Sequence, residues 1–421
     1  MSVANVKIWG KSVGYLYWDA PNNSAIFEID EAYKEEPFNV APLIHSTKQT
    51  LLEGRDFSAF FNGLPPTFND SLPDSFGNIV FKEWLEYNNI NQNKLNPVER
   101  LLYVGKRGVG ALEYVVEKEL PNIEHNIDLN ELSAISDKII KRKYEQKDNL
   151  NNPEALLNML LIGSSVGGAQ AKILVAINEN NDLLAGDILH KEEVDYYIVK
   201  LAHDKSDIWG LEKNFVEFVY NQIAKAVGVN MSDSRLIEGG GSTHFASKRF
   251  DRVNGQKIHM QTLNAMTGFY GRNTDFSYEK TFKVLEFLKV PYAQKEQLFT
   301  QMVFNIAASN RDDHTKNFSF LMDTTGKWSL SPAYDVTFPI DPYSPFNTEH
   351  KMSINSKVKG ITKDDILKVG KLVGINHPNQ IIERVIDGLQ TFESRIKQYQ
   401  INKNTVKLIL KSINSNLELL R

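Results

Sequence analysis

Residues 307–335, which read AASNRDDHTKNFSFLMDTTGKWSLSPAYD, are the stretch that decides the fold. Before it, the spacing of Leu298, Met302 and Ile306 predicts a helix with one apolar face. A polar loop follows that carries two adjacent carboxylates, a histidine, a lysine and an asparagine. Two short apolar runs joined by DTTGK then predict a tight hairpin. Because a hairpin returns the chain to where it left, Asp335 is expected to lie beside the loop.

The polar residues of this stretch are those that phosphoryl transfer needs. One carboxylate can accept the proton of an attacking hydroxyl, while an asparagine and a second carboxylate hold Mg²⁺ on the phosphates. Asp312 and Asn317 have the D-x-x-x-x-N spacing of a kinase catalytic loop, and Asp335 supplies the second carboxylate. The alternative is a hydrated turn after a helix, where Asp and Asn are common for backbone reasons. The hairpin and Asp335 together favour a phosphoryl-transfer site over a hydrated turn.

Two glycine-rich stretches compete for the phosphates of a nucleotide. Residues 105–110 read GKRGVG, whereas residues 163–172 read GSSVGGAQAK and lead directly into an apolar strand. Backbone N–H groups of the second stretch can cradle phosphates, and Lys172 can add a point charge. Neither stretch is a Walker A motif, and tight turns without a ligand explain either one as well. The choice between them stays open at this point.

A lysine on the next apolar strand favours the second stretch. In Tyr196–Leu201, Lys200 lies on an apolar strand, where an ionised side chain needs a partner. In kinases, the lysine at this place binds the α- and β-phosphates and pairs with a helix glutamate. Glu217 is the best partner by position, although Asn214 and Glu217 also read as a capping box. A lysine that reaches into solvent from an edge strand is the alternative for Lys200.

The amino-acid composition excludes several classes of protein. The chain has 421 residues, and 48 Lys and Arg against 52 Asp and Glu give a formal charge of −4. This length predicts two or three domains, and the charge argues against a protein that is basic overall and binds nucleic acid. No cysteine is present, which excludes disulfides, thiolate zinc sites and cysteine nucleophiles. No signal peptide or bilayer-spanning apolar run is expected, so the predicted location is the cytoplasm.

The pattern along the chain predicts an α+β protein in three parts. Short strands and turns with some helix occupy residues 1–150, which close with the polar linker KDNLNN. Strands and one helix, from about Phe215 to Val227, occupy residues 151–255. Helical patterns with one hairpin occupy residues 256–421. Between the last two parts, Asn-Gly at 254–255 predicts a hairpin between two longer strands, 246–250 and 257–261.

Four motifs in collinear order make the chain resemble the HipA family, the serine/threonine kinases of bacterial toxin–antitoxin modules. Residues 165–172, SVGGAQAK, are similar to its S-x-x-G-A-Q-x-K loop, and residues 197–201, YIVKL, to its nucleotide-lysine strand. Residues 311–320, RDDHTKNFSF, resemble its D-x-H-x-K-N catalytic loop, and residues 330–336, LSPAYDV, its metal-binding segment. The stretches LPDSFG and GALEY are similar to the extra subdomain that precedes the kinase lobes.

The resemblance implies a two-lobed, protein-kinase-like α+β fold with an extra N-terminal β-rich subdomain, and ATP with Mg²⁺ as the phosphoryl donor. Asp312 would be the catalytic base and Lys200 the lysine that pairs with phosphate, while Asn317 and Asp335 would hold the metal. Further residues expected around the nucleotide are Val166, Gly167, Gly168, Ala169, Gln170, Lys172, Lys248, Phe250, Asp251, His314 and Lys316. Of these, the residues from Lys248 to Phe250 would line the adenine pocket and Asp251 would lie beside the ribose.

The chain departs from the family pattern on both sides of the predicted site. Asp313 follows the predicted base, where the family more often has a small or hydrophobic residue. Its charge would raise the pKa of the neighbouring carboxyl unless a cation such as Lys316 compensates it. Val336 and Thr337 follow Asp335, so this segment has no glycine hinge. His314 has no second histidine at ligand spacing and is expected to shape the loop by hydrogen bonds.

The resemblance also implies regulation and partners. Members of this family are inactivated by autophosphorylation on the loop serine, which maps onto Ser165 or the adjacent Ser164. A HipB-like helix-turn-helix antitoxin would be the partner, and DNA would be reached only through it. The implied substrate is a protein of the translation machinery such as an aminoacyl-tRNA synthetase. No membrane contact is expected.

Two other functions stay open from the sequence. A kinase of small-molecule hydroxyl groups would use the same residues. A catalytically weak partner of an antitoxin–DNA repressor complex is the second alternative. The segment after Arg395 contains four lysines and Arg421 but only one acidic residue, Glu418. Its positive charge could therefore bring it close to phosphates. A solvated helix face explains the same charge pattern.

Overall fold

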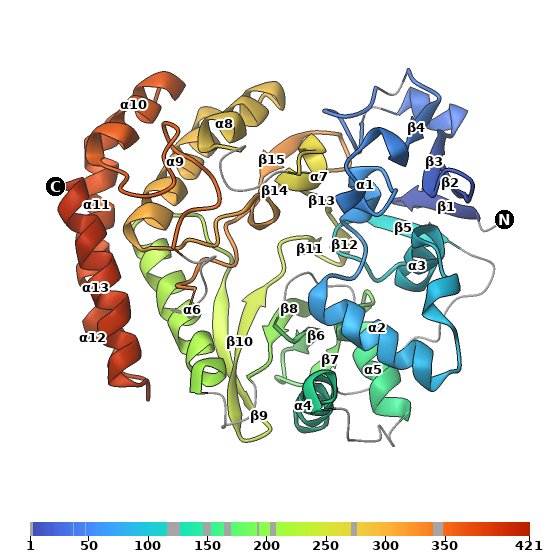
Figure 1. Ribbon diagram of the computed structural model, residues 1–421, viewed down its shortest axis with the longest axis horizontal. Coiled ribbons are helices and arrows are strands. Elements are labelled where there is room, and N and C mark those ends of the chain that lie inside the picture. The colour runs from blue at the N-terminus through green and yellow to red at the C-terminus, as the bar shows by residue number, and fades with distance from the viewer. Residues whose placement is uncertain are drawn as a thin grey trace. The chain divides into compact units, whose positions relative to one another are not determined.

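The computed structural model describes residues 3–36, 38–46, 48–115, 127–145, 153–163, 170–191, 193–202, 208–270, 276–339 and 348–421. The chain forms two compact units, each assembled from segments that are distant in sequence (Figure 1). Unit 1 contains residues 1–203, 237–270 and 321–327, and unit 2 contains residues 204–236, 271–320 and 328–421. Both units mix helices and strands, so the α+β prediction is confirmed.

The first sheet of unit 1 is antiparallel, with the strand order β4-β3-β2-β1-β5. Alternate side chains of β1, Ala4, Val6 and Ile8, are buried, as expected for a strand of a sheet with one face on a core. The strands are β1 (Val3–Ile8), β2 (Lys11–Asp19), β3 (Ser24–Ile29), β4 (Leu51–Glu53) and β5 (Leu112–Val115). The short helices around them are η1 (Glu31–Glu35), η2 (Gly54–Asp56), η3 (Ala59–Phe61), α1 (Pro66–Asn69), α2 (Ser75–Tyr87), η4 (Gln92–Lys94) and α3 (Pro97–Val104).

The second sheet has the strand order β7-β6-β8-β10-β9, and its strands lie next to α4 and α5 (Figure 1). Its strands are β6 (Lys172–Asn178), β7 (Leu183–Ala185), β8 (Val194–Lys200), β9 (Ser234–Gly239) and β10 (Ser242–Lys248). Helices α4 (Leu129–Glu145) and α5 (Pro153–Gly163) share one buried apolar core with α2 and β6. The N-terminal part and the strands that follow it therefore form one compact unit. The predicted linker at 147–152 lies outside the described residues.

The Asn-Gly hairpin is shorter than predicted. Its strands, β11 (Arg252–Val253) and β12 (Gln256–Lys257), have two residues each, because β10 ends at Lys248. The strand predicted over residues 257–261 is divided in the structure between β12 and β13 (His259–Thr262). Helix α7 (Leu263–Thr267) follows β13. The turn itself was predicted correctly, since Asn254 and Gly255 both have positive φ.

Unit 2 is mainly helical, and its core surrounds Tyr220, whose ring packs edge-to-face against Phe304 and Phe392. Its helices are α6 (Ile208–Ala226), α8 (Tyr278–Phe287), α9 (Tyr292–Ala307), α10 (Lys363–Val373), α11 (Pro378–Gln390), α12 (Phe392–Ile396) and α13 (Lys403–Leu420). A 3-10 turn, η5 (Thr315–Asn317), leads into the predicted hairpin, β14 (Ser319–Met322) and β15 (Trp328–Leu330). Among the described residues, none of the helices has the length and apolar character that a bilayer crossing requires.

Helix α6 corrects two predictions. It begins at Ile208, several residues before the predicted start near Phe215. Asn214 therefore lies inside the helix, and the capping-box interpretation of Asn214 and Glu217 is wrong. The helix also belongs to unit 2, whereas the sequence grouped it with residues 151–255.

Candidate active site

The C-terminal end of α9 sets the position of the predicted catalytic loop. Ser309 adopts a left-handed backbone conformation with φ 57°, which ends the helix. Carbonyl groups in the last turn would lack partners there. The Tyr220 hydroxyl donates to the Ala308 carbonyl at 2.8 Å, and the Asn416 amide donates to the Ile306 carbonyl at 2.7 Å. The loop therefore starts from a fixed helix end in the core of unit 2.

Within the loop, short hydrogen bonds orient the predicted site residues. His314 caps η5, because its Nδ1 accepts from the Lys316 N–H at 3.2 Å. This bond places the ring hydrogen on Nε2, which lies 3.7 Å from Asp312 Oδ1, too far for a direct hydrogen bond. Asn317 Nδ2 donates to the Asp312 carbonyl at 2.8 Å. Its amide oxygen is then the atom that could bind a cation.

The hairpin brings Asp335 back to this loop, as predicted. The Ser331 N–H donates to the Ser319 carbonyl at 3.0 Å, and the Tyr334 hydroxyl donates to the Lys316 carbonyl at 2.7 Å. The Ser319 hydroxyl lies 2.6 Å from the same tyrosine oxygen, so Tyr334 joins the two segments. Asp335 itself has φ 56°, a left-handed conformation that aspartate tolerates better than most residues.

Charges around Asp312 alter its acidity. Its side chain is 48% exposed. The burial it does have raises the pKa of the carboxyl above its usual value. His314 and Lys351 oppose this shift, whereas Asp335 adds to it through like-charge repulsion. The hydrogen bonds that join residues 316 and 319 to residues 331 and 334 account for this influence, because they hold the segment with Asp335 beside the loop. A carboxylate with a raised pKa, at a partly open position, is suited to accept a proton.

The structure also shows how the adjacent Asp313 is compensated. Its buried carboxylate accepts hydrogen bonds from the Tyr278 hydroxyl at 2.9 Å, His350 Nδ1 at 3.0 Å and the Lys351 N–H at 2.7 Å. The expectation that Lys316 compensates this charge is therefore replaced by a set of three donors. Sequence reasoning missed these partners, because nothing in the pattern around residue 350 links it to a loop 37 positions earlier.

In unit 1, two lysines lie side by side on the second sheet. Lys172 on β6 is the register partner of Lys200 on β8, and each is only 8% exposed. The ammonium group of Lys200 also lies 5.8 Å from the ring centre of Phe245. Two neighbouring ammonium groups of this kind are the type of donors that bind phosphate oxygens.

Only the end of the predicted phosphate loop can be described. Gln170 Nε2 donates to the Leu201 carbonyl at 3.1 Å, which ties the loop to the end of β8. A Cβ atom on Gly163 would lie 3.1 Å from the Lys172 carbonyl oxygen, so the two ends of the loop are close together. The residues predicted here as phosphate-binding or phosphorylated that lie outside the described residues are Ser164, Ser165, Val166, Gly167, Gly168 and Ala169.

The competing stretch, residues 105–110, has a different role. Arg252 donates from its guanidinium to the carbonyls of Gly110 and Gly108, both at 2.9 Å. The Gly110 N–H donates to Asp251 Oδ2 at 2.8 Å. Carbonyl oxygens that face an arginine do not offer a phosphate the donors it needs. This stretch is bound to Asp251 and to Arg252 of the β11–β12 hairpin, which leaves residues 163–172 as the candidate phosphate loop.

The predicted adenine and ribose residues are involved in contacts within unit 1. Lys248 forms an ion pair with Asp195 at 2.6 Å. Asp251 is buried between Arg249 and Arg252; burial alone would raise the pKa of Asp251, but the two guanidinium groups hold it well below the usual value. Its oxygens accept from these guanidinium groups and from the Gly110 N–H, so Asp251 has a structural role within unit 1, and its predicted place beside the ribose stays a prediction. The roles of Lys248, Phe250 and Glu217 toward a nucleotide stay predictions.

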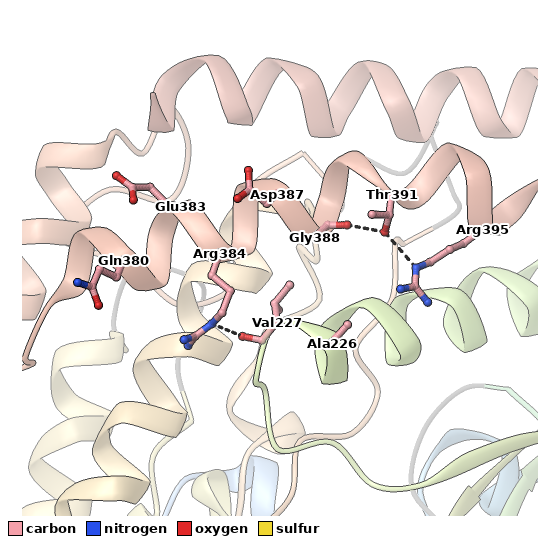
Figure 2. A pocket seen from close by; sticks show the side chains of 9 residues that line it. All are labelled: Ala226, Val227, Gln380, Glu383, Arg384, Asp387, Gly388, Thr391 and Arg395. Atoms are coloured by element: carbon pink, nitrogen blue, oxygen red, sulfur yellow. Dashed lines mark hydrogen bonds between the residues drawn. The ribbon is translucent and has the colours of Figure 1, made fainter.

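A surface pocket of about 520 Å³ lies elsewhere in unit 2, where the end of α6 meets α11 and α12 (Figure 2). Arg384 Nε donates there to the Val227 carbonyl at 2.7 Å, and Arg395 Nε donates to Thr391 Oγ1 at 3.0 Å. The lining residues are Ala226, Val227, Gln380, Glu383, Arg384, Asp387, Gly388, Thr391 and Arg395. None of them is among the predicted site residues.

The oxygen atoms of Asn317 and Asp335 suit Mg²⁺ as a ligand set. Within the described ranges there is no cluster of three or more His, Cys, Asp or Glu that could hold a metal alone. Mg²⁺ usually takes one or two protein oxygens and completes its shell with water and phosphate oxygens. The Asn317 amide oxygen and the Asp335 carboxylate are hard ligands of this kind. The residues therefore fit a metal held together with a nucleotide.

These two sets of residues on an α+β fold define a protein of the kinase class. More specifically, the chain belongs to the HipA family. The HipA N-terminal domain family matches residues 4–115, and the HipA-like C-terminal domain family matches residues 164–395. The family and the two-lobed, kinase-like fold predicted from the sequence are thus confirmed.

Individual relatives agree with this assignment. A protein from Haemophilus influenzae named as a candidate kinase is 24% identical over 270 residues, which cover 56% of this chain and 74% of that protein. The serine/threonine-protein kinase toxin HipA of Shewanella oneidensis is 26% identical over 163 residues, or 34% of this chain and 37% of that protein. Among solved structures, a Shewanella oneidensis HipA, HipB and operator DNA complex contains a chain that superposes with a TM-score of 0.68 and 17% identity, covering 99% of this chain and 96% of that one.

Proposed function

We propose that this chain is an ATP-dependent serine/threonine protein kinase and the toxin component of a toxin–antitoxin module. The observation that supports this most directly is the arrangement of Asp312, Asn317 and Asp335 in unit 2. A base candidate with a raised pKa, an amide oxygen and a second carboxylate are held together there by a loop and the hairpin that follows it. Phosphoryl transfer to a hydroxyl requires this combination.

In the proposed mechanism, Asp312 accepts the proton of the substrate hydroxyl as that oxygen attacks the γ-phosphorus. The bond from the γ-phosphorus to the bridging oxygen breaks, and ADP leaves with the electron pair. Lys172 and Lys200 bind phosphate oxygens and neutralise their charge. Asn317 and Asp335 would hold Mg²⁺, which would supply positive charge to offset the negative charge that develops during transfer. His314 and Tyr334 orient the loop through their bonds to the backbone of residue 316.

The finer parts of the proposal concern regulation and partners. Autophosphorylation on Ser165 or Ser164 would place a dianion on the loop that binds the nucleotide phosphates, and the repulsion would stop catalysis. The Shewanella oneidensis structure with HipB and operator DNA supports a HipB-like antitoxin as partner. A protein of the translation machinery in the cytoplasm is the proposed substrate.

The proposal is tested by transfer of labelled phosphate from ATP to the chain itself and to translation proteins. Asp312→Asn keeps the shape of the side chain but removes the base, so incorporation should fall by at least about 100-fold. Asp323→Asn serves as the matched control, because Asp323 lies in the turn of the same hairpin and accepts only local hydrogen bonds. Equal incorporation in the wild type and Asp312→Asn would refute the proposal. Labelling of small hydroxyl compounds but not of proteins would point to a small-molecule kinase.

A further inference from the structure

Asp313, next to the proposed base, is a buried charge that the mechanism so far does not use. Its side chain is 1% exposed. Oδ2 accepts from the Tyr278 hydroxyl and His350 Nδ1, and Oδ1 accepts from the Lys351 N–H. A buried carboxylate costs free energy unless donors satisfy it, and with three donors it is held in one orientation. Because Asp313 accepts at Oδ2, the His350 ring must carry a hydrogen on Nδ1.

One of these donors extends the network into the helices. The Tyr278 hydroxyl, at the start of α8, also accepts from Asn305 Nδ2 at 3.0 Å. Asn305 Oδ1 in turn accepts from Asn310 Nδ2 at 3.0 Å, at the point where α9 gives way to the loop. All of these residues are buried. The network thus connects α8 and α9 to the residue that follows Asp312, and connected buried hydrogen bonds reinforce one another.

The other two donors come from a segment that follows Asp335 in the chain, residues 350–358. This segment is itself held firmly: the His350 N–H donates to the Val358 carbonyl at 2.9 Å. Ser353 exchanges backbone hydrogen bonds with Phe276 at 3.0 Å and Tyr278 at 3.1 Å. Asp313 is therefore the connection between the predicted catalytic loop and a fixed neighbouring segment. The same connection holds Lys351, whose ammonium group favours the ionised form of Asp312.

We infer that Asp313 and His350 are positioning residues, which fix the peptide that carries Asp312 against residues 350–358 and so keep the base and Lys351 in the arrangement that transfer requires. This inference rests on the proposed kinase function. The loop is then held from both sides of Asp312, since Asn317 holds the Asp312 carbonyl and the Asp313 side chain holds the next residue. Neither residue touches the reacting atoms.

Substitutions of His350 test the inference with a matched pair. The amide nitrogen of asparagine can take the place of ring Nδ1, whereas that of glutamine reaches the place of Nε2. His350→Asn should keep kcat within about threefold of the wild type, while His350→Gln and Asp313→Asn should lower kcat at least about tenfold with KM for ATP changed less than about twofold. The double variant should be no slower than the slower single variant, because both changes break one contact. Lys359→Gln, which breaks only the exposed pair with Glu349 at the two ends flanking residues 350–358, should have wild-type kcat.

A second measurement separates this inference from the proposed function. Hydrogen exchange over peptides that cover residues 348–354 should be faster in Asp313→Asn and His350→Gln than in the wild type and His350→Asn. Wild-type kcat in Asp313→Asn and His350→Gln would overturn the inference, as would equal losses in the asparagine and glutamine variants of His350. A wild-type chain that transfers no phosphate would instead refute the kinase proposal, and the exchange pattern would still show whether Asp313 holds the segment.

Discussion

At the scale of single residues, the charges around Asp312 determine how the proposed base behaves. Burial and the nearby Asp335 carboxylate favour its protonated form, while His314 and Lys351 favour the ionised form. The base works only when ionised, so activity should fall as the pH drops through its pKa. The position of that acid limb then depends on each neighbour that the structure has identified.

Lys351→Met is expected to move the acid limb of the kcat–pH profile to higher pH. The lysine lowers the pKa of Asp312, so its loss raises that pKa and a higher pH is needed to ionise the base. The measurement is kcat at saturating ATP between about pH 5 and pH 9. Lys359→Met, at an exposed position directly after residues 350–358, should leave the limb in place. A shift of the limb to lower pH would contradict the assignment of Asp312 as the base.

Some residues around Asp312 could be predicted from the sequence and others could not, and the reason is physical. Asp312, Asn317 and Asp335 could be predicted because a loop and a hairpin bring them together over a short length of chain. The partners of Asp313 could not, because His350 reaches it through tertiary packing that leaves no periodic signal. The sequence did indicate an unusual charge at Asp313, but it suggested Lys316 as the compensating group.

At the scale of secondary-structure elements, prediction from the sequence succeeded where the pattern of apolar residues was strong. Strand β6 and the hairpin of β14 and β15 were predicted from apolar runs and a turn signal. The start of α6 was not, because Gly210 near its beginning weakens the helical signal and tertiary contacts override propensity. The glycine-rich stretch 105–110 could not be assigned either, because its role depends on Arg252, more than 140 positions away.

The turn after β7 carries a carboxylate that is costly for stability. Asp187 is 3% exposed, and neither carboxylate oxygen has a hydrogen-bond partner within the described residues. Burial raises the pKa of Asp187 to about 6, although Arg107 and Arg249 oppose the shift. Because the folded pKa lies above the unfolded value of about 3.9, ionising Asp187 costs stability, and that cost appears as the pH rises from about 4 to 6.

Asp187→Asn is therefore expected to stabilise the protein at neutral pH. The free energy of unfolding should rise by up to about 3 kcal/mol at pH 7.5 and change little at pH 4.5. Denaturant unfolding of the wild type and the variant at both pH values measures this. Glu179→Gln, at an exposed position in the preceding turn, is the control and should change little at either pH. Destabilisation at pH 7.5 would show that the carboxylate has a favourable partner.

At the scale of the whole molecule, the predicted site residues are divided between the two units. Lys172 and Lys200 belong to unit 1, while Asp312, Asn317 and Asp335 belong to unit 2. The division into units could not be predicted from composition. The apolar core that joins α2 to α4, α5 and β6 is made of long-range contacts, so the predicted boundary at residue 150 falls within unit 1.

The structure shows where the basic residues near the C-terminus lie on helix α13. Helix α13 buries Ile409, Ile413 and Leu417 on one face, and its lysines at 403, 407 and 411 are exposed. The Ser412 hydroxyl lies 2.8 Å from that of Ser309, where α9 ends. This helix thus supports the catalytic loop from within unit 2. The exposed lysines fit the solvated-face explanation of the positive charge, and their exposure is equally compatible with contact to phosphates.

If Lys200 and Asp335 each contribute to binding ATP with Mg²⁺ as proposed, a substitution of either residue should abolish the stabilisation that the nucleotide provides. At about 100 times the dissociation constant, a ligand that binds only the folded state adds about 2.7 kcal/mol to the free energy of unfolding. Thermal unfolding of the wild type should therefore shift upward with ATP and Mg²⁺ together. Lys200→Met in unit 1 and Asp335→Asn in unit 2 should each lose most of this shift, and Asp323→Asn should retain it. A full shift in either of the first two variants would mean that the nucleotide is bound without that unit's residues.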